Sequence, residues 1–127
     1  MRKLLLAAFL LAPLTSFAID FTTPMLQLDG KPVLDKDGGG ISLSSIVENA
    51  LLSPYTDEAA LAGEEKIKRY LLATKVHDAA NTHQQPVFTS DEVTLIKKLV
   101  AKSYTPLIVG QVWKLLDPAS VPEGNPR

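Results

Sequence analysis

The sequence predicts a mainly α-helical fold: a small single-domain bundle of about four helices that follows a short N-terminal β-hairpin. Apolar residues recur at helical spacing in four segments, and an Asp-Gly turn separates two short apolar stretches before them. Hydrophobic residues make up 46% of the chain but aromatic residues only 6%, which indicates a core of Leu, Ile and Val. The chain has no cysteine, so helix packing or self-association has to supply the stability that disulfides give many small domains.

The first 18 residues have the order of a secretory signal peptide. Two cations follow Met1, an unbroken apolar run occupies residues 4–12, and small residues precede the junction between Ala18 and Ile19, where we expect cleavage. The apolar run is far shorter than the roughly 20 residues of a bilayer span, so we expect no stable membrane span after cleavage. The mature chain is then expected in the periplasm or outside the cell.

The charge of the mature chain bears on its partners. Loss of Arg2 and Lys3 with the leader changes the formal charge from −1 to −3, and the charges are spread along the chain. Nucleic-acid phosphates require a basic surface, so this balance argues against a nucleic-acid partner.

The N-terminal hairpin is predicted from two short apolar stretches, at residues 25–28 and 31–34. They flank Asp29-Gly30, a common tight-turn pair. Pro32 restricts its strand to a sheet edge, because proline has no amide to donate. Residues 35–40 (DKDGGG) are expected to form a loop.

The first helix is expected to begin within residues 41–45 and to end at Ser53-Pro54. Ser42 or Ser44 can cap it, since a serine oxygen accepts from the free amides of the first turn. Its apolar positions at helical spacing are Ile46, Val47, Ala50 and Leu51.

The second helix is expected to open at residues 63–65, where two glutamates complement the positive end of the helix dipole. The residues of its apolar stripe are Ile67, Tyr70, Leu71 and Thr74, with Leu72 and Val76 beside them. We expect this stripe to face the core. Residues 77–85 are polar and are expected to form a loop.

The third helix has the clearest local signal in the chain. Thr89 and Glu92 have the spacing of a capping box, in which each side chain accepts from an amide near the other. Phe88 and Val93 flank this box at the spacing of a hydrophobic staple. The helix is therefore expected to begin near Ser90.

A fourth helix is expected to follow Thr105-Pro106, because proline fits the first turn of a helix. Residues 107–116 are apolar nearly all round, which is typical of a helix central to a core or an interface. Asp117-Pro118 ends it. The domain is therefore expected at residues 19–117, with a disordered tail at residues 118–127 that contains three prolines.

Residues 35–40 resemble the front of a calcium-binding loop. Asp35 and Asp37 stand at the first and third positions, and a glycine stands at the sixth. The fifth position is Gly39 and the twelfth is Ile46, where calcium needs oxygen ligands. Two carboxylates bind calcium weakly, and Asp/Gly clusters are common in turns. A weak calcium site at Asp35 and Asp37 is therefore an alternative hypothesis.

Signatures of catalysis and of other cofactors are lacking in the sequence. His77, Asp78 and His83 are the one cluster that resembles a transition-metal site, but zinc needs three or four converging ligands. No serine lies in a Gly-x-Ser-x-Gly motif, and no cysteine can act as a nucleophile. We therefore expect no enzymatic activity, no bound cofactor and no metal.

The apolar fourth helix suggests an interaction surface. Trp113 is the only tryptophan of the chain, and tryptophan is enriched at interface hot spots, although a lone tryptophan on an apolar helix also fits a core. We predict that Trp113 forms a protein-binding surface together with Tyr104, Leu107 and Ile108.

Several runs of the chain resemble small uncharacterised proteins of tailed bacteriophages and prophages. These runs are IDFTTP at 19–24, LDGKP at 28–32, NALL at 49–52, GEEK at 63–66, IKKLV at 96–100 and YTPLIVGQ at 104–111. The resemblance covers roughly residues 19–117 and implies no enzymatic activity. Such proteins begin directly at the Asp-Phe-Thr segment and are cytoplasmic, so the leader departs from their pattern.

These observations lead us to expect a non-enzymatic, exported small binding or accessory protein, encoded by a phage or prophage, that acts by protein–protein contact. Self-association is one form that such contact can take. Two alternatives are the weak calcium-binding domain and a cytoplasmic phage assembly or structural component. An uncleaved N-terminus would favour the second of these.

Overall fold

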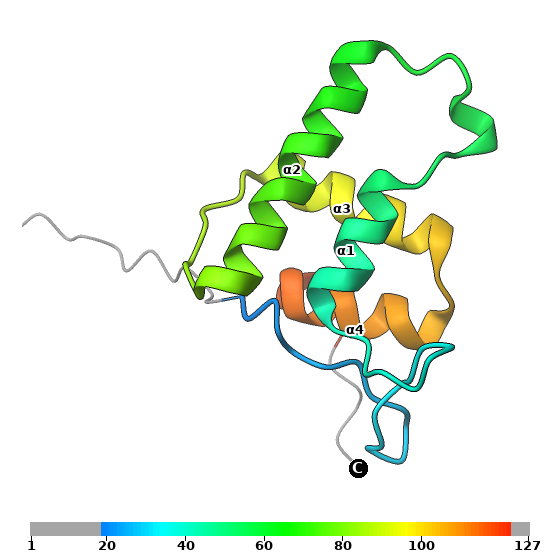
Figure 1. Cartoon of the computed structure of the whole chain (residues 1–127), viewed down its shortest axis with the longest axis vertical. Coiled ribbons are helices and arrows are strands. Elements are labelled where there is room, and N and C mark those ends of the chain that lie inside the picture. Colours follow the sequence, from blue (N-terminus) through cyan, green and yellow to red (C-terminus); the bar gives the residue numbers. More distant parts are fainter. Residues whose placement is uncertain (1–18, 123–127) are drawn as a thin grey trace, which may run out of the picture.

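The computed structural model describes residues 19–122, and within them the chain is mainly helical, as predicted. In chain order the elements are α1 (Leu43–Leu52), the 3-10 helix η1 (Thr56–Glu58), α2 (Gly63–Thr82), α3 (Ser90–Ser103), α4 (Pro106–Leu116) and the 3-10 helix η2 (Pro118–Ser120). α1 lies beside α2 and also packs against α3, and α3 packs against α4 (Figure 1). The predicted signal peptide, including Ala18, lies outside the described residues.

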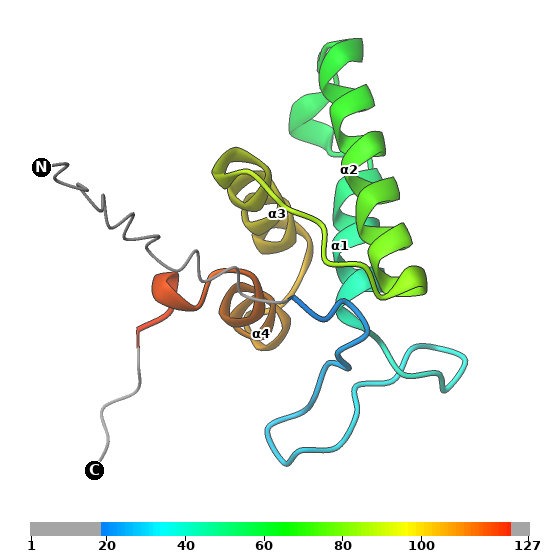
Figure 2. The same cartoon turned by 90° about the vertical axis from the view of Figure 1, so that its left-hand side faces the viewer.

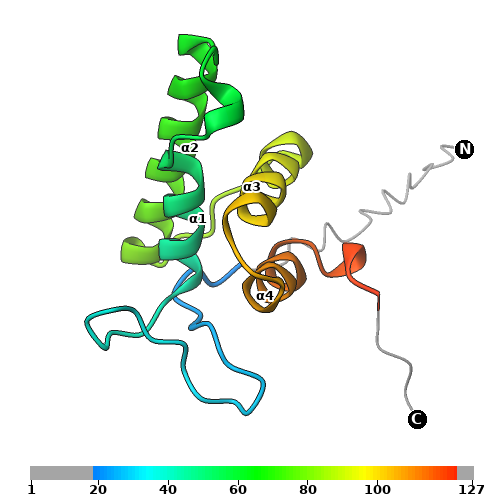
Figure 3. The same cartoon turned by 90° about the vertical axis from the view of Figure 1, so that its right-hand side faces the viewer.

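Single backbone bridges hold the segment before α1. The three antiparallel bridges are Pro24–Ser42, Leu26–Pro32 and Leu34–Gly40. Gly30 has a φ of 86°, which glycine adopts without strain, and the chain reverses there. Two loops project from the helices as a result (Figure 3). Residues 19–122 thus show isolated bridges, and no strand, where a hairpin is expected.

Buried side chains and hydrogen bonds attach this N-terminal segment to the helices. Phe21 and Met25 are fully buried, and the ring of Phe21 lies 5.6 Å from that of Phe88. The side-chain amide of Gln111, on α4, donates to the carbonyl of Leu26 at 2.7 Å and accepts from its amide at 2.8 Å. The segment is therefore part of the folded domain although it lacks regular structure.

The start of α1 confirms Ser42 as its cap. The Ser42 hydroxyl accepts from the amide of Ser45, and the Ser45 hydroxyl accepts from the amide of Ser42. Two amides that the helix leaves free are thereby satisfied. The helix ends before Ser53-Pro54, also as predicted.

The second helix is longer than its polar sequence predicts. Residues 77–82 are helical, and the expected loop begins only at His83, which has a left-handed φ of 55°. Ala79 is buried in the core. Asn81 and Thr82 donate from their side chains to carbonyls one turn earlier. Packing of this turn against the core thus extends a helix whose local sequence does not favour it.

The side of α2 that faces the core also differs from the prediction. Ile67, Tyr70 and Leu71 are exposed, so the expected core-facing stripe faces solvent. The buried residues of α2 are Arg69, Leu72, Ala73, Val76 and Ala79. The buried side of α2 contains an arginine and two alanines, so its sequence is less apolar than that of a usual core-facing side. The stripe at 67–71 is therefore the stronger apolar pattern in the sequence, although it faces solvent.

The predicted starts of α3 and α4 are confirmed. The Thr89 hydroxyl accepts from the amide of Glu92 at 3.1 Å, and the Glu92 carboxylate accepts from the amide of Thr89 at 2.9 Å. α4 begins at Pro106 and ends before Asp117. η2 follows at the start of the expected tail. None of the helices within residues 19–122 combines the length and apolar character that crossing a bilayer requires.

Replacement of Thr89 by alanine is expected to lower the free energy of unfolding by about 1 kcal/mol, because the amide of Glu92 loses its capping oxygen. Urea denaturation measures this change. The control is Thr89→Ser, which keeps the hydroxyl and should change the free energy by less than about 0.5 kcal/mol. Equal losses in the two variants would show that the methyl group of Thr89, and not its hydrogen bond, stabilises the helix start.

Candidate protein-binding surface

An exposed apolar strip follows the N-terminal half of α2. Ile67, Tyr70 and Leu71 form this strip, the α2 ridge, and are 59%, 61% and 58% exposed. Residues three and four positions apart lie on the same side of a helix, so the three side chains are neighbours. The other helices lie to one side of α2 (Figure 2). The exposure of all three ridge side chains shows that these helices do not cover the ridge.

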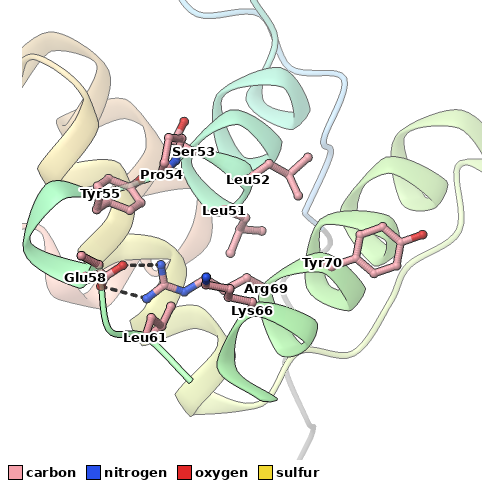
Figure 4. A pocket seen from close by; sticks show the side chains of 11 residues that line it. Leu51, Leu52, Ser53, Pro54, Tyr55, Glu58, Leu61, Lys66, Arg69 and Tyr70 are labelled. Carbon is pink, nitrogen blue, oxygen red and sulfur yellow. Dashed lines mark hydrogen bonds and ion pairs between the residues drawn. The ribbon is translucent and has the colours of Figure 1, made fainter. Parts of the chain in front are cut away.

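A groove of about 360 Å³, the α1–α2 groove, separates the ridge from the end of α1 (Figure 4). Its lining residues are Leu51, Leu52, Ser53, Pro54, Tyr55, Glu58, Ala59, Leu61, Lys66, Arg69 and Tyr70. Most of these side chains are apolar. Leu52 is 58% exposed and extends the apolar surface of the ridge across the groove.

Arg69 and Glu58 form a bidentate ion pair in this groove (Figure 4). The two terminal nitrogens of Arg69 donate to the Glu58 carboxylate at 2.6 and 2.9 Å. These hydrogen bonds, together with the charges of Arg69 and Lys102, lower the pKa of Glu58 from the usual 4.5 to about 2. Nε of Arg69 is buried and has no hydrogen-bond partner within residues 19–122. The pair fixes η1 against α2.

Tyr55 extends this attachment to the remaining helices. Nζ of Lys102 lies 5.0 Å from the centre of the Tyr55 ring, and Cζ of Arg69 lies 6.0 Å from it. The Tyr55 hydroxyl donates to the carbonyl of Ala50 at 2.5 Å and lies 2.7 Å from the hydroxyl oxygen of Ser103. The connection between α1 and α2 is therefore held to α1, α2 and α3, so the groove has firm walls.

A second groove, of about 460 Å³, lies on the other side of the ridge, between α2 and α3. Its apolar lining is Leu71, Leu72 and Leu95, and its charged lining is Glu65, Lys68, Lys75, Asp91 and Glu92. Lys75 pairs with Glu92 at 3.4 Å across this α2–α3 groove. The ridge therefore stands between two grooves whose apolar residues are bordered by charges.

The four residues predicted to form an interaction surface do not lie together on one exposed face. Ile108 is buried, at 6% exposed, and Tyr104 and Leu107 are half-buried. Trp113 is half-buried and donates from Nε1 to the carbonyl of Lys97 at 3.2 Å. Leu107 and Trp113 flank the buried face of α4 on opposite sides, because six residues rotate the side-chain direction by about 600°, which is not a whole number of turns. The hydrogen bond from Trp113 to Lys97 attaches α4 to α3.

The acidic loop forms a turn through its own carboxylate. The Asp35 side chain accepts from the amides of Asp37 and Gly39 at 2.8 and 2.9 Å. Asp and Asn side chains commonly stabilise turns in this way. The geometry of the loop is thus explained without calcium, and no other carboxylate joins Asp35 and Asp37: no group of three or more metal-ligating residues occurs within residues 19–122.

The histidines singled out in the sequence also lie apart from each other. Nδ1 of His77 lies 2.6 Å from the carboxylate of Glu48, on α1. His83 ends α2 in the left-handed conformation. These positions link α1 to α2 and terminate a helix, and His77, Asp78 and His83 do not converge.

The groups around the ridge suit binding better than covalent chemistry. The ridge offers two aliphatic side chains and a phenol, and the ion pairs beside it tie up several of the charged groups at the grooves. A partner would gain affinity by burying the apolar ridge and would find charges at its rims.

The apolar pattern of the sequence identifies the ridge residues as one strip but predicts that they face the core. Glu58, Lys66 and Arg69 carry no local signal of a groove, because charged residues are ordinarily solvated. Comparison of the chain with protein-family models, with curated proteins and with solved structures finds no match.

Proposed function

We propose that the protein is a non-enzymatic binding or accessory protein that is exported across the inner membrane and acts by protein–protein contact. The α2 ridge carries this proposal. Three large side chains, each more than half exposed, lie together on a helix whose other side is fully packed. Contiguous exposed apolar surface of this kind is typical of interaction sites and lowers solubility when it has no partner.

Export is inferred from the leader at residues 1–18, with its cations, apolar run and small residues before Ile19. The acidic balance of the mature chain favours a protein partner over a nucleic acid. The resemblance to small phage and prophage proteins fits an accessory role, because that resemblance implies no enzymatic activity.

Photo-crosslinking in bacterial cells tests both parts of the proposal. A photoreactive residue replaces Leu71 on the ridge in one strain, and Leu28, which is 97% exposed and far from α2 in the sequence, in the control strain. We expect an adduct from position 71 and none from position 28, in the periplasmic fraction. Intact-mass analysis should show a chain that begins at Ile19.

Two results would contradict this proposal separately. The absence of any adduct from position 71 would remove the ridge as a binding surface. A full-length chain in the cytosol that still begins at Met1 would remove export and would favour the cytoplasmic phage component instead.

A further inference from the structure

We propose that the partner of the α2 ridge is a second copy of this chain, docked with its own α2 antiparallel to the first across a two-fold axis near Tyr70 and Leu71. This inference rests on the proposed binding role of the ridge and names its occupant. Three observations favour it: the shape of the surface, its charge pattern and the uncapped start of α2.

The shape is self-complementary. A two-fold axis brings the same patch of both copies together, so a surface that pairs with itself needs a projection next to a matching hollow. The ridge projects between the α1–α2 groove and the α2–α3 groove, and apolar side chains line both. In an antiparallel pairing about Tyr70 and Leu71, the ridge of each copy lies along the grooves of the other. Helices commonly pack in this way, with the ridges of one in the grooves of the other.

The charges on the α1 side of the ridge are also complementary. Lys66 lines the α1–α2 groove near the start of α2 and makes no ion pair within residues 19–122. His77 lies eleven residues later, three helical turns on, and therefore on the same side of the helix. It contacts the Glu48 carboxylate at 2.6 Å. Antiparallel pairing brings Lys66 of each copy close to Glu48 of the other.

On the opposite side of the ridge the order of the charges along α2 is reversed, with the acidic residue first and the basic residue after it. Glu64 is exposed near the start of α2, and Lys75 lies eleven residues later on the same side. Antiparallel pairing brings Glu64 of each copy close to Lys75 of the other, whose ammonium is then shared between Glu64 and Glu92 of its own chain. Both charge pairings are compatible with one two-fold axis. The midpoint between residues 64 and 75 and the midpoint between residues 66 and 77 each lie within about 1.5 Å of the point between Tyr70 and Leu71, because the rise along the helix is about 1.5 Å per residue.

The start of α2 provides the third observation. α2 begins after Ala62 without any side-chain cap, so its first amides lack a side-chain acceptor. In the same register Asp78 of the second copy lies opposite Gly63, the first residue of the helix. A carboxylate is favourable at a helix N-terminus, because the free amides and the helix dipole both attract it.

Sedimentation velocity of the protein recovered from cells tests the inference between about 1 and 500 μM, a range that brackets the micromolar affinity of a small interface. We expect a concentration-dependent monomer–dimer equilibrium. Leu71→Glu should weaken dimerisation at least tenfold, because it buries a carboxylate against apolar side chains. The matched control is Leu28→Glu, which makes the same change at a position 97% exposed on a loop and should leave the equilibrium unchanged.

A charge exchange tests the antiparallel register. Lys66→Glu alone should weaken the dimer up to about tenfold, because two symmetry-related ion pairs become repulsive. Addition of Glu48→Lys to the same chain should restore the wild-type equilibrium. If the double variant restores the dimer, the antiparallel register is supported. If it does not, although Leu71→Glu still weakens the dimer, the register is overturned.

The occupant and the binding surface can fail separately. A monomer at all concentrations, or a dimer that Leu71→Glu leaves intact, overturns the second copy as occupant. If the position-71 crosslink then has the mass of a different protein, the proposed binding function still stands. If it yields no adduct at all, the binding function fails as well.

Discussion

Replacement of Leu72 by alanine is expected to lower the free energy of unfolding by about 3 kcal/mol, whereas Leu71→Ala should change it by less than about 0.5 kcal/mol. The two residues are adjacent and chemically identical. Leu72 is 4% exposed and belongs to the core, and Leu71 is 58% exposed on the ridge. The difference arises because only Leu72→Ala leaves a cavity and loses buried apolar contacts.

Urea denaturation at about 1 μM protein measures this difference at a concentration where the ridge is largely free of a second copy. Circular dichroism of both variants controls for a change in helix content. A large loss for Leu71→Ala together with a small one for Leu72→Ala would mean that α2 turns its predicted stripe to the core after all, and the proposed binding surface would disappear.

The sequence predicts the elements whose signals are local. Thr89 and Glu92 satisfy each other's amides within four residues, so their pattern alone locates the start of α3. Ser42 and Pro106 locate the starts of α1 and α4 for similar reasons. None of these signals depends on what the helix later packs against.

The face and the length of α2 depend on distant partners and are therefore mispredicted. Arg69 is buried because Glu58, eleven residues earlier, neutralises it, and no local pattern reports that pairing. Residues 77–82 are helical because Ala79 packs into the core. Periodicity identifies Ile67, Tyr70 and Leu71 as one strip but cannot tell a core-facing strip from an interface, since both are apolar at the same spacing.

The same limit applies to the predicted interaction surface. Tryptophan is frequent at interfaces, which is why the sequence predicts a binding role for Trp113. Its indole nitrogen donates to the carbonyl of Lys97, and Nζ of Lys97 lies 4.5 Å from the centre of its ring. The residue type indicates that a side chain readily makes contacts. Only the packing shows whether those contacts are made within the chain or are left for a partner.

Arg69→Met is expected to lower the free energy of unfolding at pH 7 by about 2 kcal/mol, less than the 3–5 kcal/mol of a fully buried ion pair that loses one partner. The loss is moderated because Glu58 keeps Lys102 at 3.5 Å. The matched control is Lys68→Met: Lys68 pairs with Glu65 at 3.1 Å on the exposed surface, and its loss should change the free energy by less than about 0.5 kcal/mol.

The pH dependence of this difference separates the ion pair from simple packing of the arginine stem. Because folding lowers the pKa of Glu58 from 4.5 to about 2, the carboxylate stabilises the fold above pH 4.5, and this stabilisation is lost as the pH falls toward 2. Asp20 and Glu92 also have lowered pKa values and are unchanged in the variant. Wild type and Arg69→Met should therefore both lose stability in acid, wild type more steeply.

Urea denaturation at pH 7, 5 and 3 should accordingly show that the difference in the free energy of unfolding between wild type and Arg69→Met becomes smaller as the pH falls. Lys68→Met should follow the wild type at all three pH values. A gap that stays constant from pH 7 to 3 would mean that Arg69 stabilises α2 through its aliphatic stem alone. In that case charge does not hold η1 against α2, and the Tyr55 contacts with Ala50 and Ser103 alone fix this wall of the α1–α2 groove.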